Sequence, residues 1–357
     1  MADHPYKSLP DSAYWRRSVA AKGVAVDPLV GDFPRIGPAD KIATAGSCFA
    51  QHVARHLAGA GFTFLVTESA HPIVPEEAAR AAGYGLYSAR YGNIYTTLQL
   101  VQMFDRAYGR FAPIEDVWAA PDGQHVVDPF RPTIQPGGFA SEAEMRADRA
   151  QHLARVREMF ETLDVLVFTL GLTETWLSKA DGAAFPLCPG VAGGRFDPAA
   201  HEFRNLRTGD VREQIEAFVV RLREVNPAAR VILTVSPVPL AATASGNHVL
   251  PATIYSKSAL RAAAQEAAED LEGVFYFPSY EIVTGPQARG RFFAEDLREV
   301  TEEGVEQVMR VFLHHATGEE RPAAGRPKDA GVKDRFTAAV GQWAETLCDE
   351  AMLDRED

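Results

Sequence analysis

Ser47 is the residue whose type and setting best suit chemistry. It follows an apolar run, residues 41–45, and a helical pattern begins at Cys48. The free N–H groups and the dipole of a helix N-terminus can stabilise an oxyanion, and a serine hydroxyl there can attack an acyl carbon. The alternative is structural, because serine is a common N-cap. Cys48 is a second candidate nucleophile, since a helix N-terminus activates a thiol. Buried cysteines are common, however, and we favour Ser47.

Other polar residues follow later apolar runs. Gly171, Thr173 and Glu174 come directly after the run 165–170. Glycine allows close backbone approach, and the Thr173 hydroxyl can donate to an oxyanion. A plain turn is the alternative. Asp296 precedes another helical pattern. Its carboxylate either orients a catalytic base or is a solvated, locally bonded loop carboxylate.

The elements that must position these residues can be inferred from five short apolar runs. Such runs are typical of strands buried on both faces of a parallel sheet, and helical patterns separate most of them. This alternation predicts an α/β protein, a three-layer α/β/α sandwich with a five-stranded parallel sheet. Ligands bind outside the carboxyl ends of such strands, which is where Ser47 is expected. The expected strands are Ile42–Ala45, Phe62–Val66, Val165–Leu170, Val231–Val235 and Val274–Phe277, and the expected helices are Cys48–Gly59, Glu142–Leu163, Arg212–Val225, Ser256–Leu271 and Thr301–His314.

The chain divides into four expected parts. Residues 1–38 form an N-terminal arm, and residues 39–316 form the α/β domain. A large insertion, residues 70–140, follows its second strand. Residues 317–334 are a linker, and 335–357 form a C-terminal helix.

Two long segments exceed a minimal sandwich. Residues 180–210 are expected to be a loop, and loops of this length are usually functional. The 70–140 insertion carries aromatic and basic residues that could stack on and bond a sugar or another polar ligand, although packing of a subdomain explains the aromatic residues equally well. These residues are Tyr87, Tyr91, Tyr95, Tyr108, Arg90, Arg106, Arg110 and Arg131.

Charge and cysteine content restrict the class of protein. The formal net charge of −12 argues against general binding to nucleic acid or anionic membranes. The apolar runs are far shorter than the roughly 20 residues needed to span a bilayer, and no secretion signal is visible. Cys48, Cys188 and Cys348 are odd in number and lack metal-ligand spacing. We therefore expect a reduced, cytoplasmic protein, with its oligomeric state left open.

Five sequence blocks, in order, resemble those of the GSCFA family, a branch of the SGNH/GDSL hydrolase superfamily. The similarity covers most of the chain, from about residue 38 to 315. The blocks are GSCFA at Gly46–Ala50, GLTE at Gly171–Glu174, SPVPL at Ser236–Leu240, YSKSALR at Tyr255–Arg261 and YFPSYEI at Tyr276–Ile282.

The resemblance implies a flavodoxin-like sandwich and assigns roles to individual residues. The superfamily's nucleophile falls on Ser47, whose N–H is one oxyanion donor. The second-block glycine is matched loosely by Gly92, with Asn93 beside it. The third-block asparagine is replaced by Thr173. The aspartate of the final Asp-x-x-His block falls on Asp296.

The histidine of that final block is absent, since Glu299 stands in its place. A serine nucleophile needs a base with a pKa near neutral, and imidazole is the usual one. Three alternatives stay open. Glu299 acts as the base with a pKa raised by burial, a histidine such as His201, the preferred candidate, or His248 reaches in from a loop, or the triad is incomplete.

The function implied is an SGNH-type serine esterase or O-acyltransferase for a small-molecule or saccharide substrate. Ser47 would form an acyl-enzyme, Thr173 would hold the oxyanion, and Asp296 would orient the base. No metal or organic cofactor is required. The alternative is a ligand-binding or regulatory protein that keeps the pocket and has lost turnover.

Overall fold

The structure of the protein is a computed structural model that describes residues 4–47, 49–59, 61–318 and 352–353. Most of the predicted linker and of the predicted C-terminal helix therefore lies outside the described residues, and so does Cys48.

Five parallel strands form the central sheet, in the order β10-β9-β5-β1-β2. This order is the 2-1-3-4-5 arrangement of flavodoxin-like, doubly wound folds. The predicted five-stranded parallel sheet is thereby confirmed. Its strands are β1 (Lys41–Gly46), β2 (Thr63–Phe64), β5 (Val165–Leu170), β9 (Arg230–Val235) and β10 (Val274–Tyr276).

The strands are buried on both faces. In β5, Leu166 and Phe168 face one apolar core, whereas Val165 and Val167 face the other. This division follows from the alternation of side chains along a strand. All six residues of β5 are buried, which explains why its sequence is an unbroken apolar run.

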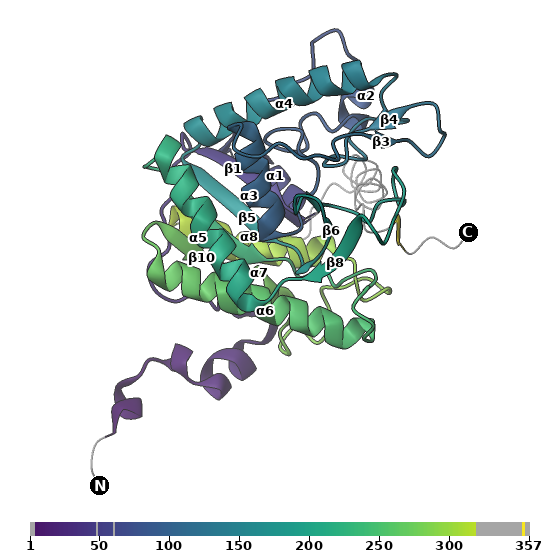
Figure 1. Ribbon diagram of the computed structural model, residues 1–357. Coiled ribbons are helices and arrows are strands. Elements are labelled where there is room, and N and C mark those ends of the chain that lie inside the picture. The colour runs from purple at the N-terminus through teal and green to yellow at the C-terminus, as the bar shows by residue number, and fades with distance from the viewer. Residues whose placement is uncertain (1–3, 48, 60, 319–351, 354–357) are drawn as a thin grey trace.

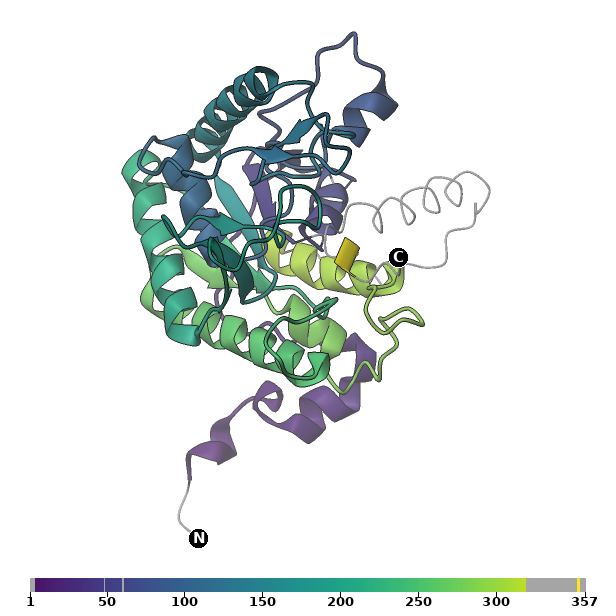
Figure 2. The ribbon, with the colours of Figure 1, turned by 45° about the vertical axis from the view of Figure 1, so that its right-hand side comes forward.

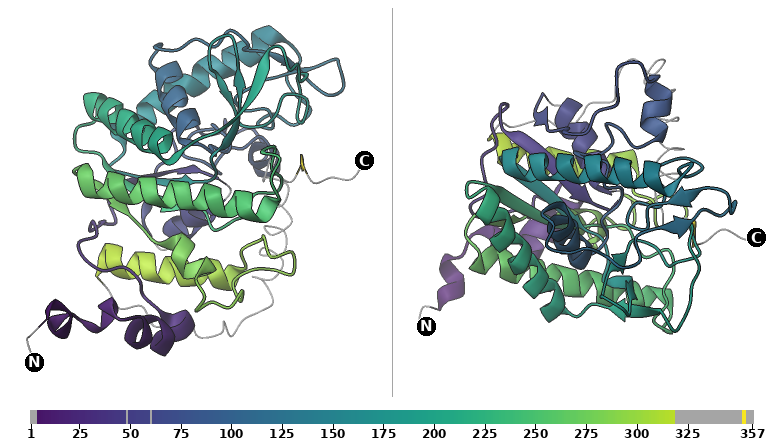
Figure 3. Two further views of the ribbon diagram at one scale, coloured as in Figure 1. Left: turned by 60° about the horizontal axis from the view of Figure 1, so that its bottom comes forward. Right: turned by 45° about the horizontal axis from the view of Figure 1, so that its top comes forward.

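Helices cover both faces of the sheet and complete the predicted three layers (Figure 3). None of the helices that the structure describes combines the length and the apolar character needed to cross a membrane. The helices are α1 (Phe49–Gly59), α7 (Ser279–Thr284) and α8 (Glu302–Thr317) on one face, and α3 (Thr97–Ala107), α4 (Glu142–Thr162), α5 (Thr208–Val225) and α6 (Val249–Asp270) on the other.

The insertion contributes to the sandwich itself. It contains α2 (Glu76–Ala81), a two-stranded sheet of β3 (Trp118–Ala119) and β4 (Val126–Val127), and α3. A capping box between Thr96 and Gln99 starts α3. The buried side chains of α3 then join the same core as those of α4 and α5. The sequence analysis did not predict this helix.

The segment expected to be a loop, residues 180–210, contains two strands. β7 (Ala184–Phe185) and β8 (His201–Asn205) both pair antiparallel with β6 (Glu174–Ser178). The loop prediction is wrong for these residues because the five residues HEFRN of β8 show no apolar run. Their strand conformation depends on pairing with β6, which the local sequence does not reveal.

The N-terminal arm is anchored at its end. Phe33 packs against the rings of Phe275, Phe277 and Phe312, with ring centroids 5.7–6.4 Å apart. The first turns of the arm project away from the sandwich (Figures 1 and 2). They are 3₁₀ turns at Pro5–Ser8 and Asp11–Ala13, followed by a π-helical turn at Arg16–Ala20. A further 3₁₀ turn, Gly23–Ala25, lies against the sandwich, since its Val24 packs on the core.

Candidate functional site

Ser47 directly follows β1 at the carboxyl edge of the sheet. The preceding Gly46 has a φ of 135°, and a Cβ there would lie 2.2 Å from the Thr169 carbonyl oxygen. Only glycine allows this approach, which turns the chain toward α1. Ser47 is 4% exposed. Its Oγ has no hydrogen-bond partner among the residues that the structure describes. Among the described residues, the Ser47 hydroxyl therefore makes no hydrogen bond that would stabilise the fold.

A small pocket lies over Ser47, between the ends of β1, β5 and β9. The switch in strand order between β1 and β5 is the position where doubly wound folds bind ligands. We call this small pocket the Ser47 pocket. Its described lining residues are Ser47, Tyr95, Gly171, Leu172, Ser236, Val238, Pro239, Leu240 and Lys257.

Lys257 lines the Ser47 pocket but was not predicted from the sequence to be a site residue. It lies on α6 and is only 2% exposed, and its Nζ donates a hydrogen bond to the Gly171 carbonyl oxygen at 2.5 Å. The sequence carried a signal, because Lys257 is three residues before Leu260 and seven before Ala264, on the apolar stripe of an Ala-rich helix. A lysine on such a stripe is buried at a cost and requires an explanation.

The predicted oxyanion donors are already engaged. The Ser47 N–H donates to the Thr169 carbonyl oxygen at 3.3 Å. The Thr173 hydroxyl donates to Asn205 Oδ1 at 2.6 Å, and the Thr173 N–H donates to Ser256 Oγ at 3.0 Å. Gly171 does line the pocket, but Thr173 is not among the residues found there. The hydroxyl of Thr173 fastens β8 to the end of β5.

Glu174 stabilises the loop that forms one wall of the Ser47 pocket. Its carboxylate accepts hydrogen bonds from the Thr243 hydroxyl at 2.5 Å and from the Ala244 N–H at 3.2 Å. These residues belong to the loop after β9, whose earlier part, Val238 to Leu240, forms one wall of the Ser47 pocket. The structure thus gives Glu174 a supporting position.

Gly92 and Asn93 lie close to the end of β1 but do not line the Ser47 pocket. Gly92 has a φ of 71°, and Asn93 is buried, accepting a long hydrogen bond of 3.4 Å from Gln51 Nε2. The next N–H, of Ile94, donates to the Gly46 carbonyl oxygen at 2.8 Å. This hydrogen bond holds the segment 92–94 against the end of β1. The predicted role of Cys48 lies outside the described residues.

His201 is not brought to Ser47. Its Nε2 pairs with Glu115 Oε2 at 2.8 Å, and its Nδ1 accepts a hydrogen bond from the Asp197 N–H at 3.1 Å. It begins β8, whose other end, Asn205, bonds Thr173. Four residues of strand separate the two ends by about 13 Å. Both ring nitrogens serve the packing of β8, which speaks against the predicted role as base.

Asp296 and Glu299 share an exposed turn. Asp296 Oδ1 accepts hydrogen bonds from the N–H groups of Arg298 and Glu299, at 2.9 and 3.0 Å. Both carboxylate residues are exposed, and neither is found among the residues lining the Ser47 pocket. The carboxylate of Asp296 shapes its own loop, as in the structural alternative considered for it. His248 is likewise exposed and caps α6 through a hydrogen bond from the Leu250 N–H.

The insertion's tyrosines and arginines are largely packed inside the protein. Tyr87, Tyr91 and Tyr95 are buried, and Arg90 is 2% exposed. Arg90 Nη1 contacts Asp148 at 2.7 Å. These four residues form the interior of the insertion and its contact with α4, which agrees with the packing alternative considered from the sequence.

One group of side chains has the composition of a metal site. Asp27, His314 and His315 bring one ligand atom each within 4.8 Å of one another. His315 Nε2 already pairs with Asp27 at 2.8 Å. The group lies at the end of α8, where the Ala316 carbonyl accepts a hydrogen bond from Ile36 shortly before β1 begins. It is therefore near the amino edge of the sheet, opposite the Ser47 pocket.

Comparison with known protein families agrees with this architecture. Residues 41–312 match the GSCFA family, a stretch that contains all five strands of the central sheet and every described residue of the Ser47 pocket. A search of curated proteins found no match. Because the family match covers most of the chain, the protein belongs to the GSCFA family.

Proposed function

We propose that the protein is a serine esterase or O-acyltransferase that forms an acyl-enzyme on Ser47. The observation that carries the proposal is the buried Ser47 hydroxyl, which has no hydrogen-bond partner among the described residues and shares a pocket with Lys257. A small-molecule or saccharide O-acyl substrate, a cytoplasmic location and kinship with the SGNH/GDSL hydrolases are part of this proposal.

Lys257 is the base that we propose for Ser47. Tyr95 and Lys257 are the titratable residues among the described lining residues, and burial favours the uncharged forms, which is the proton-bearing form of a phenol but the basic form of an amine. Burial favours the neutral form of an amine. Serine–lysine pairs are an established variant of the serine–histidine arrangement. A neutral Lys257 keeps one N–H for the Gly171 carbonyl and has a lone pair for the Ser47 proton.

The reaction then follows in balanced steps. As Lys257 takes the hydroxyl proton, Ser47 Oγ bonds to the acyl carbon of the ester. The tetrahedral intermediate collapses, the C–O bond to the alcohol breaks, and Lys257 returns the proton to that alcohol. Water or an acceptor hydroxyl next attacks the acyl-enzyme, and the same amine serves again as base. Hydrolysis and acyl transfer differ only in this second nucleophile.

A second candidate is a ligand-binding or regulatory protein without turnover. It is favoured by the positions of Asp296, in an exposed turn, and His201, paired with Glu115. Among the described residues of the Ser47 pocket there is no imidazole or carboxylate. The test below separates the two candidates.

The experiment is labelling with a fluorophosphonate probe, followed by peptide mapping, from about pH 6 to pH 10, where imidazole or an amine can act as base. We expect labelling of Ser47 in the natural protein, none in Ser47→Ala and a rate about 100-fold lower in Lys257→Met. Lys179→Met is the matched control, because Lys179 Nζ also bonds a backbone carbonyl, that of Pro198, but outside the pocket. Absence of labelling at every pH would favour the binding protein.

A further inference from the structure

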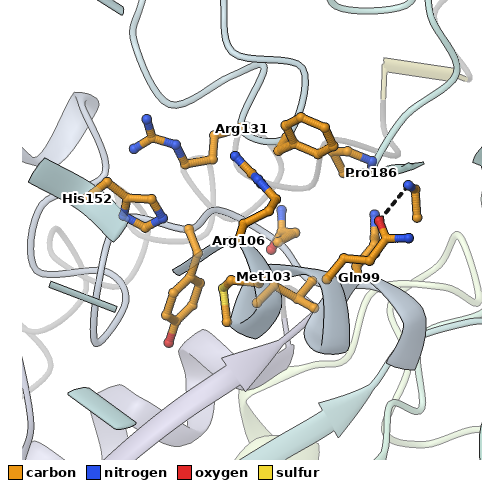
Figure 4. Close-up of a pocket in the computed structure, with 12 residues that line it drawn as sticks. Gln99, Met103, Arg106, Arg131, His152 and Pro186 are labelled. Carbon is orange, nitrogen blue, oxygen red and sulfur yellow. Dashed lines mark hydrogen bonds between the residues drawn. The ribbon is translucent and has the colours of Figure 1, made fainter. Parts of the chain in front are cut away.

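A second pocket lies beside the Ser47 pocket, on the other side of the segment 93–95. Asn93 and Ile94 line the second pocket, whereas Tyr95 lines the first. We call the second one the Arg106 pocket. It contains about 380 Å³ of space between atoms, including its mouth. Its lining residues include Gln99, Met103, Arg106, Arg131, His152 and Pro186 (Figure 4).

Arg106 is a cation without an anionic partner. Its Cζ lies 3.8 Å from the ring centroid of Phe130, so one face of the guanidinium is stacked on an aromatic ring. Within the described part of the chain no hydrogen bond or ion pair of the Arg106 side chain is found. Stacking leaves the N–H donors at the edge of the guanidinium plane available. In the view of Figure 4, Arg106 lies between Arg131 and His152 on one side and Pro186 on the other.

Neighbouring carboxylates are already matched by other arginines. Asp128 is held at 3.0 Å by both Arg131 and Arg149. Asp148 is held at 2.8 Å by Arg131 and at 2.7 Å by Arg90. Asp128 and Asp148 thus form their ion pairs with other arginines, and Asp128 acts on Arg106 only through its longer-range charge.

His152 adds no positive charge at neutral pH. Burial and the charge of Arg131 lower its pKa to about 4. Its Nδ1 donates to Glu68 Oε2 at 2.8 Å. Arg106 itself stays protonated, although burial lowers its pKa to about 10. The cation of this pocket at pH 7 that lacks a carboxylate is therefore Arg106.

We propose that the Arg106 pocket binds a small oxyanion, a carboxylate, phosphate or sulfate group, through the guanidinium edge of Arg106. A planar fork of N–H donors matches two oxygens of such a group. Because the volume given above includes open solvent, the enclosed part of the pocket has room for one small anionic group rather than for a whole drug-sized ligand. The site is independent of the chemistry at Ser47, so either proposal stands if the other fails.

The test is isothermal titration of the full chain with sulfate, inorganic phosphate and acetate at constant ionic strength. We expect saturable binding of at least one of these anions, weakened about 10- to 100-fold in Arg106→Gln. The matched control is Arg110→Gln. Arg110 is exposed, lies just after α3, the helix that carries Arg106, and pairs with Glu224. This variant removes the same charge and should bind as the natural protein does.

A second measurement guards against a variant that fails to fold. Arg106→Gln breaks no ion pair among the described residues and loses the stacking of the guanidinium on Phe130, so without anions it should still melt cooperatively, within about 4 °C of the natural protein. In the natural protein the anion should raise the melting temperature, and in Arg106→Gln it should not. Equal binding by the natural protein and Arg106→Gln, or equal loss in Arg110→Gln, would overturn the proposal.

Discussion

The Nζ atom of Lys257 lies 2.5 Å from the carbonyl oxygen of Gly171, and this contact joins α6 to the end of β5. Gly171 is in turn packed against Ser47, since a Cβ added to it would lie 3.3 Å from Ser47 Cβ. Lysine, glycine and serine thus form one contiguous layer at the switch point of the sheet. The ammonium or amine of Lys257 is held in this layer by the backbone of the residue that touches the serine.

The pH profile of Ser47 labelling should report the protonation of Lys257. A base must be neutral to accept a proton, so the labelling rate should rise as the amine loses its proton and level off above the pKa of that amine. In Lys257→Met the rise should vanish. A rise of the same shape in Lys257→Met would assign the base to another residue.

His201→Ala should weaken the fold and leave the reactivity of Ser47 unchanged. The substitution removes the partner of one oxygen of the partly buried Glu115 carboxylate, while Trp118 Nε1 still donates to the other oxygen, and losses of this kind cost about 1–3 kcal/mol. Urea unfolding measures the cost, and fluorophosphonate labelling of the folded variant measures reactivity. If the folded variant lost labelling, His201 would return as the base.

Two glycines of the site should respond differently to alanine. Both have a positive φ, 135° at Gly46 and 71° at Gly92. A Cβ at Gly46 would meet the Thr169 carbonyl at 2.2 Å, whereas a Cβ at Gly92 meets no atom within 4 Å. Gly92→Ala should therefore cost about 1–2 kcal/mol, the backbone penalty alone. Gly46→Ala should cost at least about 3 kcal/mol, because a backbone clash is added. Equal losses on urea unfolding would contradict the close approach at Gly46.

The buried pair of Glu68 and His152 should make the protein sensitive to acid. Burial opposes ionisation of Glu68, but hydrogen bonds from His152 and the Arg90 N–H and the charge of Arg131 lower its pKa to about 2. The pKa of His152 is lowered to about 4. In both cases the unfolded chain takes up its proton at a higher pH than the folded chain does.

Stability should consequently fall with pH in two overlapping windows. His152 contributes as pH falls from about 6.5 to 4, and Glu68 contributes from about 4.5 to 2, each by up to about 1.4 kcal/mol per pH unit. Melting temperatures measured between pH 7 and pH 4 test this. His152→Gln should remove most of the slope above about pH 4.5. An unchanged slope would mean that other groups carry it.

The fold was predictable where a single element determines its own pattern. β5 was predicted at its observed bounds, Val165–Leu170, because both of its faces are buried and its sequence is apolar throughout. The edge strand β2 pairs with β1 at only two positions, so the predicted run Phe62–Val66 was too long. The strand conformation of β8 depends on pairing with β6, and the five polar and aromatic residues of β8 do not reveal that pairing.

The site was predictable only as far as topology determines it. The end of β1 and the start of its helix put Ser47 at the ligand-binding edge of the sheet. Its role as nucleophile remains a prediction. The burial of Lys257 could not be predicted, because one lysine in an Ala-rich helix resembles a solvent-exposed residue. Its burial follows from the contact with the end of β5. His201 was chosen as a loop residue, but it belongs to a strand whose pairing the sequence does not show.

The burial of Ser47 has a kinetic consequence. With the residue 4% exposed and one pocket wall continuous with the loop that Glu174 braces, a reagent can reach the hydroxyl only after that wall has moved. A reaction that must wait for such an opening cannot become faster than the opening itself, however much reagent is added. Reagents of very different intrinsic reactivity should then approach the same limiting labelling rate. That limiting rate would measure how fast the pocket opens and not how reactive Ser47 is.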